Sequence, residues 1–134
     1  MKSWKPGNIV MCEYVVEGVN NKHTLINTYA GDIIVNEVPA QIPIAFYMEF
    51  IPTESKAEHL KMRILVGKKE AVGGTAEVEF EAGRPAIMVV PMGILRIDET
   101  TSLQLFVQSG DDRPTKILER KITYVEKATT SPTS

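Results

Sequence analysis

The chain has 134 residues, a length that suits one domain, and 43% of its residues are hydrophobic while 24% are charged. A chain of this size and composition buries a globular core without help from metals or disulfides. The net charge of −2, with basic residues scattered along the chain, argues against a dedicated nucleic-acid binder.

The scarcity of cysteine and of long apolar segments indicates the compartment in which the protein works. Cys12 is the single cysteine, so no intrachain disulfide forms and nothing points to an oxidising compartment. The first ten residues lack the apolar run of a signal peptide, and no segment approaches the ~18 apolar residues of a membrane span. We therefore expect a soluble cytoplasmic protein, or a virion protein if a phage encodes it. Residues 1–126 are expected to form one domain, followed by a polar tail at 127–134.

The strongest local signal for β structure lies in residues 9–50. A β-branched and aromatic run over 9–17 is followed by a Gly/Asn turn at 18–22 and a second run over 23–29. Two extended segments joined by such a turn predict a β-hairpin.

The first strand is predicted to start only at residue 9, because Pro6-Gly7 reads as a turn within an irregular segment 1–8. Glu13 and Glu17 share one parity along this strand, which places the even positions on the inward face. These inward residues are Val10, Cys12, Tyr14 and Val16.

The same stretch carries a family resemblance. Its second strand ends in the pattern Tyr29-x-Gly31 and leads through Pro39, Ala40 and Pro43 into a further apolar strand. This arrangement resembles an uncharacterised family of short bacterial and phage proteins, catalogued as a domain of unknown function. The resemblance covers about the first third of the chain. It implies a β-sandwich and supplies no site residues, because no activity is assigned to the family.

The rest of the chain alternates between short apolar runs and turn residues. We expect strands over residues 33–35, 44–51, 59–66, 75–81, 86–97, 102–108 and 116–126, with a break at residues 91–93 and a mobile loop at 67–74. No stretch shows the i, i+3, i+4 periodicity of a long helix. The sequence therefore predicts an all-β fold of about eight strands. The expected architecture is an antiparallel two-sheet sandwich of the Greek-key type, similar to immunoglobulin or C2 domains, with a barrel as the alternative.

The sequence offers little support for a catalytic function. The two histidines, His23 and His59, stand at predicted strand starts, and Ser55 near His59 lacks a nucleophile elbow. Cys12 lies mid-strand among apolar neighbours, which favours a buried, inert thiol. We therefore expect a protein that is not an enzyme and has no catalytic residue or cofactor; a small hydrolase assembled from distant residues is a third, weaker hypothesis.

The loop aspartates and the Gly/Lys loop have the composition of ordinary turns as well as that of metal or nucleotide sites. The aspartates Asp32, Asp98, Asp111 and Asp112 fall in three loops, and a sandwich gathers such loops when it binds calcium at one end. Only two of them are adjacent, and Asp and Gly are turn residues in any case, so we expect no metal site. The Gly/Lys loop at 67–74 has no helix after it, which argues against a phosphate-binding loop.

One feature predicts an interaction surface. Several large apolar residues occupy positions that alternate with an already apolar inner face: Tyr47, Ile51, Met88, Val90 and Phe106. Together they would form an exposed patch that needs a partner. The leading hypothesis is a non-enzymatic sandwich that acts through protein–protein contact, as a homo-oligomer or within a larger assembly such as a phage structural or accessory component. The alternative is a small-ligand or calcium/lipid-binding sandwich that uses the loop aspartates.

Overall fold

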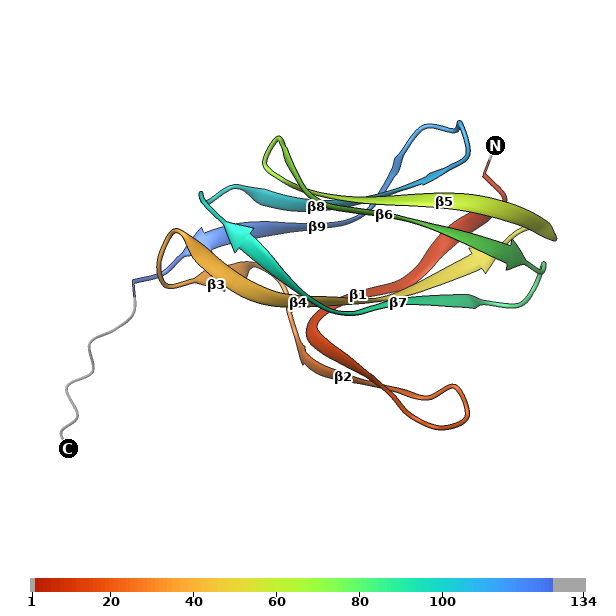
Figure 1. Ribbon diagram of the computed structural model, residues 1–134, viewed down its shortest axis with the longest axis horizontal. Coiled ribbons are helices and arrows are strands. Elements are labelled where there is room, and N and C mark those ends of the chain that lie inside the picture. The colour runs from red at the N-terminus through yellow and green to blue at the C-terminus, as the bar shows by residue number, and fades with distance from the viewer. Residues whose placement is uncertain (1, 127–134) are drawn as a thin grey trace.

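The computed structural model describes residues 2–126 and shows two β-sheets packed face to face (Figure 1). The first sheet has the order β2-β1-β4-β7. Its strands are β1 (Trp4–Glu17), β2 (His23–Thr28), β4 (Ala40–Pro52) and β7 (Ala86–Ile97). The second sheet has the order β3-β9-β8-β5-β6. Its strands are β3 (Ile33–Val35), β5 (Lys56–Val66), β6 (Lys69–Phe80), β8 (Ser102–Ser109) and β9 (Thr115–Tyr124).

This architecture confirms the predicted all-β sandwich, with nine strands among the described residues rather than about eight. Strands that are neighbours in a sheet are often not consecutive in the chain, as with β1 and β4 or β5 and β8. The pairs are antiparallel except for β3 with β9, a parallel pair that the sequence did not predict. The predicted tail at 127–134 lies outside the described residues.

The core lies between the sheets and follows the alternation of the strands. In β8 every second residue is buried, so Leu103, Leu105 and Val107 point inward. Phe46, Met48 and Phe50 do the same from β4. Because side chains alternate across a strand, one face of each sheet supplies this core and the other face is left for solvent or for another cover.

The predicted irregular start of the chain is wrong. β1 begins at Trp4, which pairs with Pro52, and Pro6-Gly7 does not end the strand. The register with β4 shifts between Pro6 and Ile9. A bulge at this place tolerates a proline, because the extra residue need not donate a ladder hydrogen bond. The longer strand brings Trp4 into the core, where it is 2% exposed.

Pro43 also lies within a strand rather than before one. Its partner across the ladder with β7 is Ile94, whereas the pairing of β4 with β1 stops at Ala45. On the side toward β1, the hydroxyl of Tyr29 donates a hydrogen bond to the carbonyl oxygen of Pro43 at 2.6 Å. A proline is accepted here because no neighbouring strand requires its missing N–H.

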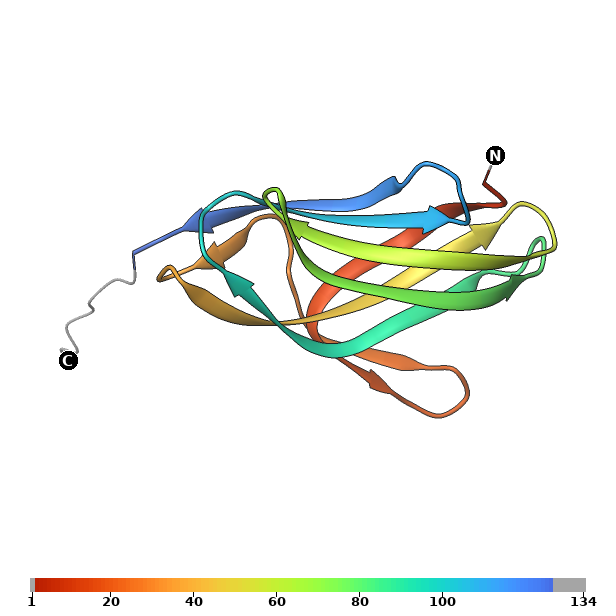
Figure 2. The same cartoon turned by 45° about the horizontal axis from the view of Figure 1, so that its top comes forward.

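The inward face predicted for β1 is wrong in its second half. Cys12 is fully buried as expected, but Tyr14 and Val16 are 40% and 38% exposed. β1 pairs with β4 as far as Cys12 and from there with β2, and the β1–β2 hairpin extends beyond the two layers (Figures 1 and 2). A strand that exchanges one partner for another meets different neighbours along its length, so no single parity describes its buried face.

Two predicted interruptions are absent. Only Gly67 and Lys68 form the turn between β5 and β6, so β6 includes most of the stretch predicted as a mobile loop. Gly67 has a φ of 63°, a conformation that glycine adopts without strain. β7 likewise continues through residues 91–93, where the register against β4 shifts between Ile44 and Phe46. Pairing along a neighbouring strand overrides the weak β propensity of glycine and proline.

Candidate functional site

The structure does not bring the five predicted interface residues onto one surface. Residues paired across a ladder point to the same face. Met88 pairs with Met48 and Val90 pairs with Phe46, so both face the space between the sheets.

The other three of these residues lie on two separate outer faces. Tyr47 and Ile51 alternate with the buried Phe50 and therefore lie on the outer face of the first sheet. Phe106 pairs with Arg63 and alternates with the buried Leu105, which places it on the outer face of the second sheet.

The β1–β2 hairpin covers Tyr47 on the outer face of the first sheet, which explains an apolar side chain at this position. A small second cluster forms there from Cys12, Val15 and Ala45, with Leu25, Tyr47 and Val89 packed against it. The ring of His23 in β2 contacts Tyr47 edge to face, with centroids 5.4 Å apart. Residues of the hairpin and of β7 also line a common hollow. Part of the predicted patch is thus a second core rather than a free surface.

The most apolar hollow lies between β6 and β7. These are the edge strands of the two sheets, and they run along the same side of the sandwich (Figure 2). A cavity of about 230 Å³ opens between them, and we call it the β6–β7 cleft. Three methionines, Met48, Met62 and Met88, contribute to its lining together with Phe50, Leu60 and Val90. Two of the predicted interface residues, Met88 and Val90, therefore meet in this cleft.

The cleft is open because β6 carries small side chains beside it. Gly74, Thr75 and Ala76 form its wall on the β6 side. A Cβ atom added to Gly74 would meet nothing within 4 Å, so the space above this residue is open. Glycine and alanine leave room that a larger residue would fill, and the flexible methionines opposite adapt to what enters.

The cleft lining limits the chemistry available there. Thr75 is the one lining residue with a polar side chain, and that side chain has the parity of the outer face; no titratable residue lines the cleft. A cavity of this kind binds apolar groups and offers neither a nucleophile nor a base. Charged residues stand close by on β6 instead, where Glu77 and Glu79 are exposed.

A second hollow of about 260 Å³ lies farther along the same two strands and is more polar. Lys69 and Glu70 from β6 line it together with Arg96 and Asp98. The guanidinium of Arg96 donates to the carboxylate of Asp98 at 2.6 Å, so these two charges are paired.

The loop aspartates are divided between the two ends of the sandwich. Asp98 follows the end of β7, and Asp32, before β3, accepts a hydrogen bond from Thr123 at 3.2 Å. Asp111 and Asp112 lie in the β8–β9 turn, at the end where Gly110 donates to the carbonyl of His59. Within residues 2–126 no three His, Cys, Asp or Glu side chains are arranged to hold a metal ion.

Ser55 and His59, the candidates for a hydrolase site, make other contacts and do not lie together. The hydroxyl of Ser55 accepts a hydrogen bond from the backbone N–H of Ala82 at 3.0 Å. His59 lies with Nδ1 3.4 Å from Glu77, and both side chains are exposed. This is a cross-strand surface pair, since the two residues are partners in the β5–β6 ladder.

Burial changes the titration of two groups near the hairpin. Desolvation raises the pKa of the Cys12 thiol, so the reactive thiolate is disfavoured. Desolvation, with the negative charge of Glu13 as the next cause, raises the pKa of Tyr29 to about 12. Both groups are held in their neutral form at neutral pH, which suits structural roles.

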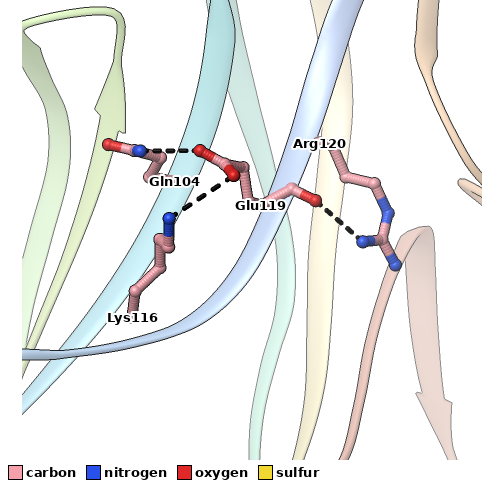
Figure 3. A network of polar contacts seen from close by, with 4 residues as sticks. All are labelled: Gln104, Lys116, Glu119 and Arg120. Atoms are coloured by element: carbon pink, nitrogen blue, oxygen red, sulfur yellow. Dashed lines mark hydrogen bonds and ion pairs between the residues drawn. The ribbon is translucent and has the colours of Figure 1, made fainter.

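The clearest polar network lies on the outer surface of the second sheet (Figure 3). Gln104 donates to the Glu119 carboxylate at 2.7 Å and Lys116 donates to it at 3.4 Å. The hydrogen bond from Gln104 is the main cause that lowers the pKa of Glu119, followed by Lys116. Arg120 donates to the backbone carbonyl of Glu119 at 2.9 Å. The bond between Gln104 and Glu119 ties β8 to β9 on this surface. The Arg120 side chain instead has the parity of the buried Leu118 and Ile122, and its Nε is buried without a hydrogen-bond partner among the described residues.

Comparison with known proteins yields no assignment. No family model matches the chain, and no curated protein matches it. The resemblance of residues 9–50 to an uncharacterised family therefore stays a prediction. Among the described residues, no helix is long and apolar enough to cross a membrane.

Sequence reasoning missed the β6 side of the cleft. Gly74 and Ala76 read as loop or ordinary strand residues, and Met62 as a core residue of β5. The available signal was the pair Gly73-Gly74 within an alternating segment, because glycine in a strand often marks a close approach of another group.

Proposed function

We propose that this protein is a non-enzymatic interaction domain, and that the β6–β7 cleft receives an apolar side chain of a protein partner. The carrying observation is a cavity of about 230 Å³ that is lined almost wholly by apolar side chains. Anchoring of one or two apolar side chains in such a pocket is how interfaces concentrate their binding energy.

The size of the cleft favours a side chain over a free ligand. Sites for drug-sized molecules usually measure about 300–1,000 Å³. The cleft, at about 230 Å³, is smaller than this range. One or two leucine-sized groups fit it, and the methionines let the walls adapt to their shape.

The charge beside the cleft defines the partner further. Glu77 and Glu79 follow the cleft wall along β6 and point to the outer face of the second sheet, where Glu77 lies 3.4 Å from His59. Glu70, farther along the strand, is paired with Arg63. Acidic groups on the strand that borders an apolar pocket favour a partner with basic residues on either side of its anchor. The proposed partner is therefore a protein segment in which leucine-like residues are flanked by lysine or arginine.

A defined peptide tests this proposal. The probe is a capped seven-residue peptide with two central leucines and flanking lysines, added to protein that carries ¹³C-labelled methionine methyl groups. The methyl signals of Met62 and Met88 should shift and saturate, because both line the cleft. Met11, which is 1% exposed in the core, should not respond.

A matched pair of variants separates the cleft from the rest of the surface. Ala76→Phe should fill the cleft and abolish the shifts, whereas Ala30→Phe adds the same ring at an exposed position between β2 and β3 and should leave them intact. Glu77→Lys with Glu79→Lys should weaken binding several-fold. The proposal is wrong if Ala76→Phe binds like the wild type, or if near-millimolar peptide shifts neither methyl group.

A further inference from the structure

β2 differs from the other three edge strands of the sandwich. The remaining edges carry features that hinder pairing with another chain: β3 has three residues, β7 contains Pro91, and β6 exposes several glutamates. Short length, proline and charge are the usual protections of a free sheet edge. β2 reads His-Thr-Leu-Ile-Asn-Thr and contains no proline, lysine or carboxylate. It is an edge that nothing in its sequence blocks.

The hydrogen-bond pattern shows which peptide groups this edge presents. The N–H of Gly18 donates to the carbonyl of Lys22 at 2.7 Å, and the register then continues through Val16–Thr24 and Tyr14–Ile26. Hydrogen-bonded and non-bonded pairs alternate along an antiparallel ladder. The peptide groups of residues 24 and 26 therefore face β1, whereas those of His23 and Leu25 face outward.

The regular part of the edge ends at Asn27. This residue has a φ of 52°, and beyond it Tyr29 donates to the carbonyl of Met11, so the alternation has changed. The usable edge is thus centred on Leu25. The hairpin extends beyond the two layers, which leaves this edge accessible to a second molecule (Figures 1 and 2).

We propose that a second copy of this chain pairs with β2 in antiparallel fashion, about a twofold axis that passes beside Leu25. A twofold axis perpendicular to the sheet keeps each face on the same side, so residues of equal parity must stand opposite each other. With the outward peptide groups at His23 and Leu25, the register places Leu25 opposite Leu25 of the second copy. This proposal does not depend on the β6–β7 cleft.

The register explains the exposed apolar residues of the hairpin. Thr24 stands opposite Ile26 of the second copy, and each of these residues is already paired with a β1 residue of its own chain. A row of four neighbouring side chains then crosses the joined sheet. It consists of Tyr14 and Ile26 of one copy, followed by Thr24 and Val16 of the other. Tyr14, Val16 and Ile26 are 38–40% exposed in the single chain. In the joined sheet they become parts of continuous rows of side-chain contacts.

Charge permits this contact. His23 is the one titratable residue within β2, and in the proposed register it stands opposite Asn27 of the second copy. Asn27 in turn donates to Glu13 at 2.6 Å, so a carboxylate lies one strand away from the incoming imidazole. No like charges oppose each other along the edge, and a protein partner of opposite charge is not required.

Sedimentation of the full chain tests the proposal. From low micromolar to near-millimolar concentration, the mass of the wild type should rise from that of one chain to that of two. The amide N–H of Leu25 should exchange more slowly as the concentration rises, whereas that of Ile26, already bonded to β1, should change little. A wild type that stays monomeric over this range overturns the proposal.

A charge pair tests the register. Thr24→Lys with Ile26→Lys places lysines opposite each other at two sites and should leave the protein monomeric. Thr24→Lys with Ile26→Glu places opposite charges at the same two sites and should restore the dimer. Both positions are exposed, and both variants share the first change. The register is wrong if the Lys/Glu variant is as monomeric as the Lys/Lys variant, and the contact is wrong if the Lys/Lys variant still dimerises like the wild type.

Discussion

The ring of Phe50 separates two regions of the same core that are filled in different ways. On one side Trp4 packs edge to face against it, with ring centroids 5.0 Å apart, and is 2% exposed. On the other side Phe50 forms part of the β6–β7 cleft, where the cavity of about 230 Å³ remains. Both regions lie between the same two sheets.

The difference comes from what closes each region. The indole N–H of Trp4 donates to the hydroxyl of Ser109, and the hydroxyl of the preceding Ser3 donates to Glu58. These bonds join the start of β1 to β8 and β5, so the first sheet is tied to the second. Across the cleft, Gly74 and Ala76 in β6 face methionines, and both are too small to close the gap. A large ring with a satisfied polar tip closes a sandwich, whereas small and flexible residues leave it open.

Removing the closing ring should have the largest effect. Trp4→Ala should lower the free energy of unfolding by about 3–5 kcal/mol, because it leaves a cavity beside Phe50. Trp4→Phe keeps a ring there but leaves Ser109 without its donor, and should cost about 1–3 kcal/mol. Urea denaturation followed by circular dichroism measures both values. If Trp4→Ala costs no more than Trp4→Phe, the ring does not close this region.

Two methionines compare the closed core with the cleft directly. Met11 is 1% exposed in the core, whereas Met88 is half-buried and lines the cleft. Met11→Ala should lower the free energy of unfolding by about 2–5 kcal/mol, and Met88→Ala by clearly less, because Met88 already borders open space. The same urea titration compares the two variants. Equal losses would mean that the cleft is packed like the core.

The smallest expected effect concerns Tyr29, whose hydroxyl donates a hydrogen bond to the carbonyl oxygen of Pro43 in β4. Its pKa in the folded protein is about 12, above the ordinary value of 10.0. The folded state therefore keeps a proton that the unfolded chain loses, so this contribution is complete below pH 10 and is lost as the pH rises toward 12. The urea midpoint of the wild type should fall more steeply over this range than that of Tyr29→Phe. Parallel curves would show that the hydroxyl is not desolvated.

Strands paired along their whole length were predictable from local pattern. β5 and β8 alternate between buried and more accessible positions as their sequences indicate, and Leu60, Ile64 and Val66 are buried as expected. The prediction was wrong where pairing changes along a strand. β1 exchanges β4 for β2 at Cys12, and the buried face changes with it, so Tyr14 and Val16 are exposed.

The candidate site was predictable only in part. The sequence predicts Met88 and Val90 as part of an exposed interaction surface, and both instead face inward and line the cleft. Their partners Gly74 and Ala76 were not predicted, because small residues carry no local mark of what lies across from them. The β2 edge was visible as a strand, but its free side became evident only from the order of strands in the sheet.

The amino-acid sequence by itself determined that this protein is all-β, since period-two alternation and frequent turn residues leave no other way to bury its apolar side chains. It also determined which residues form the core of the regular strands. Only the tertiary structure decided that β6 and β7 become neighbouring edges and that the hairpin covers Tyr47. The physical reason is that these contacts join segments far apart in the chain. Their free energy depends on which strands pair, and a local pattern of residues does not record that choice.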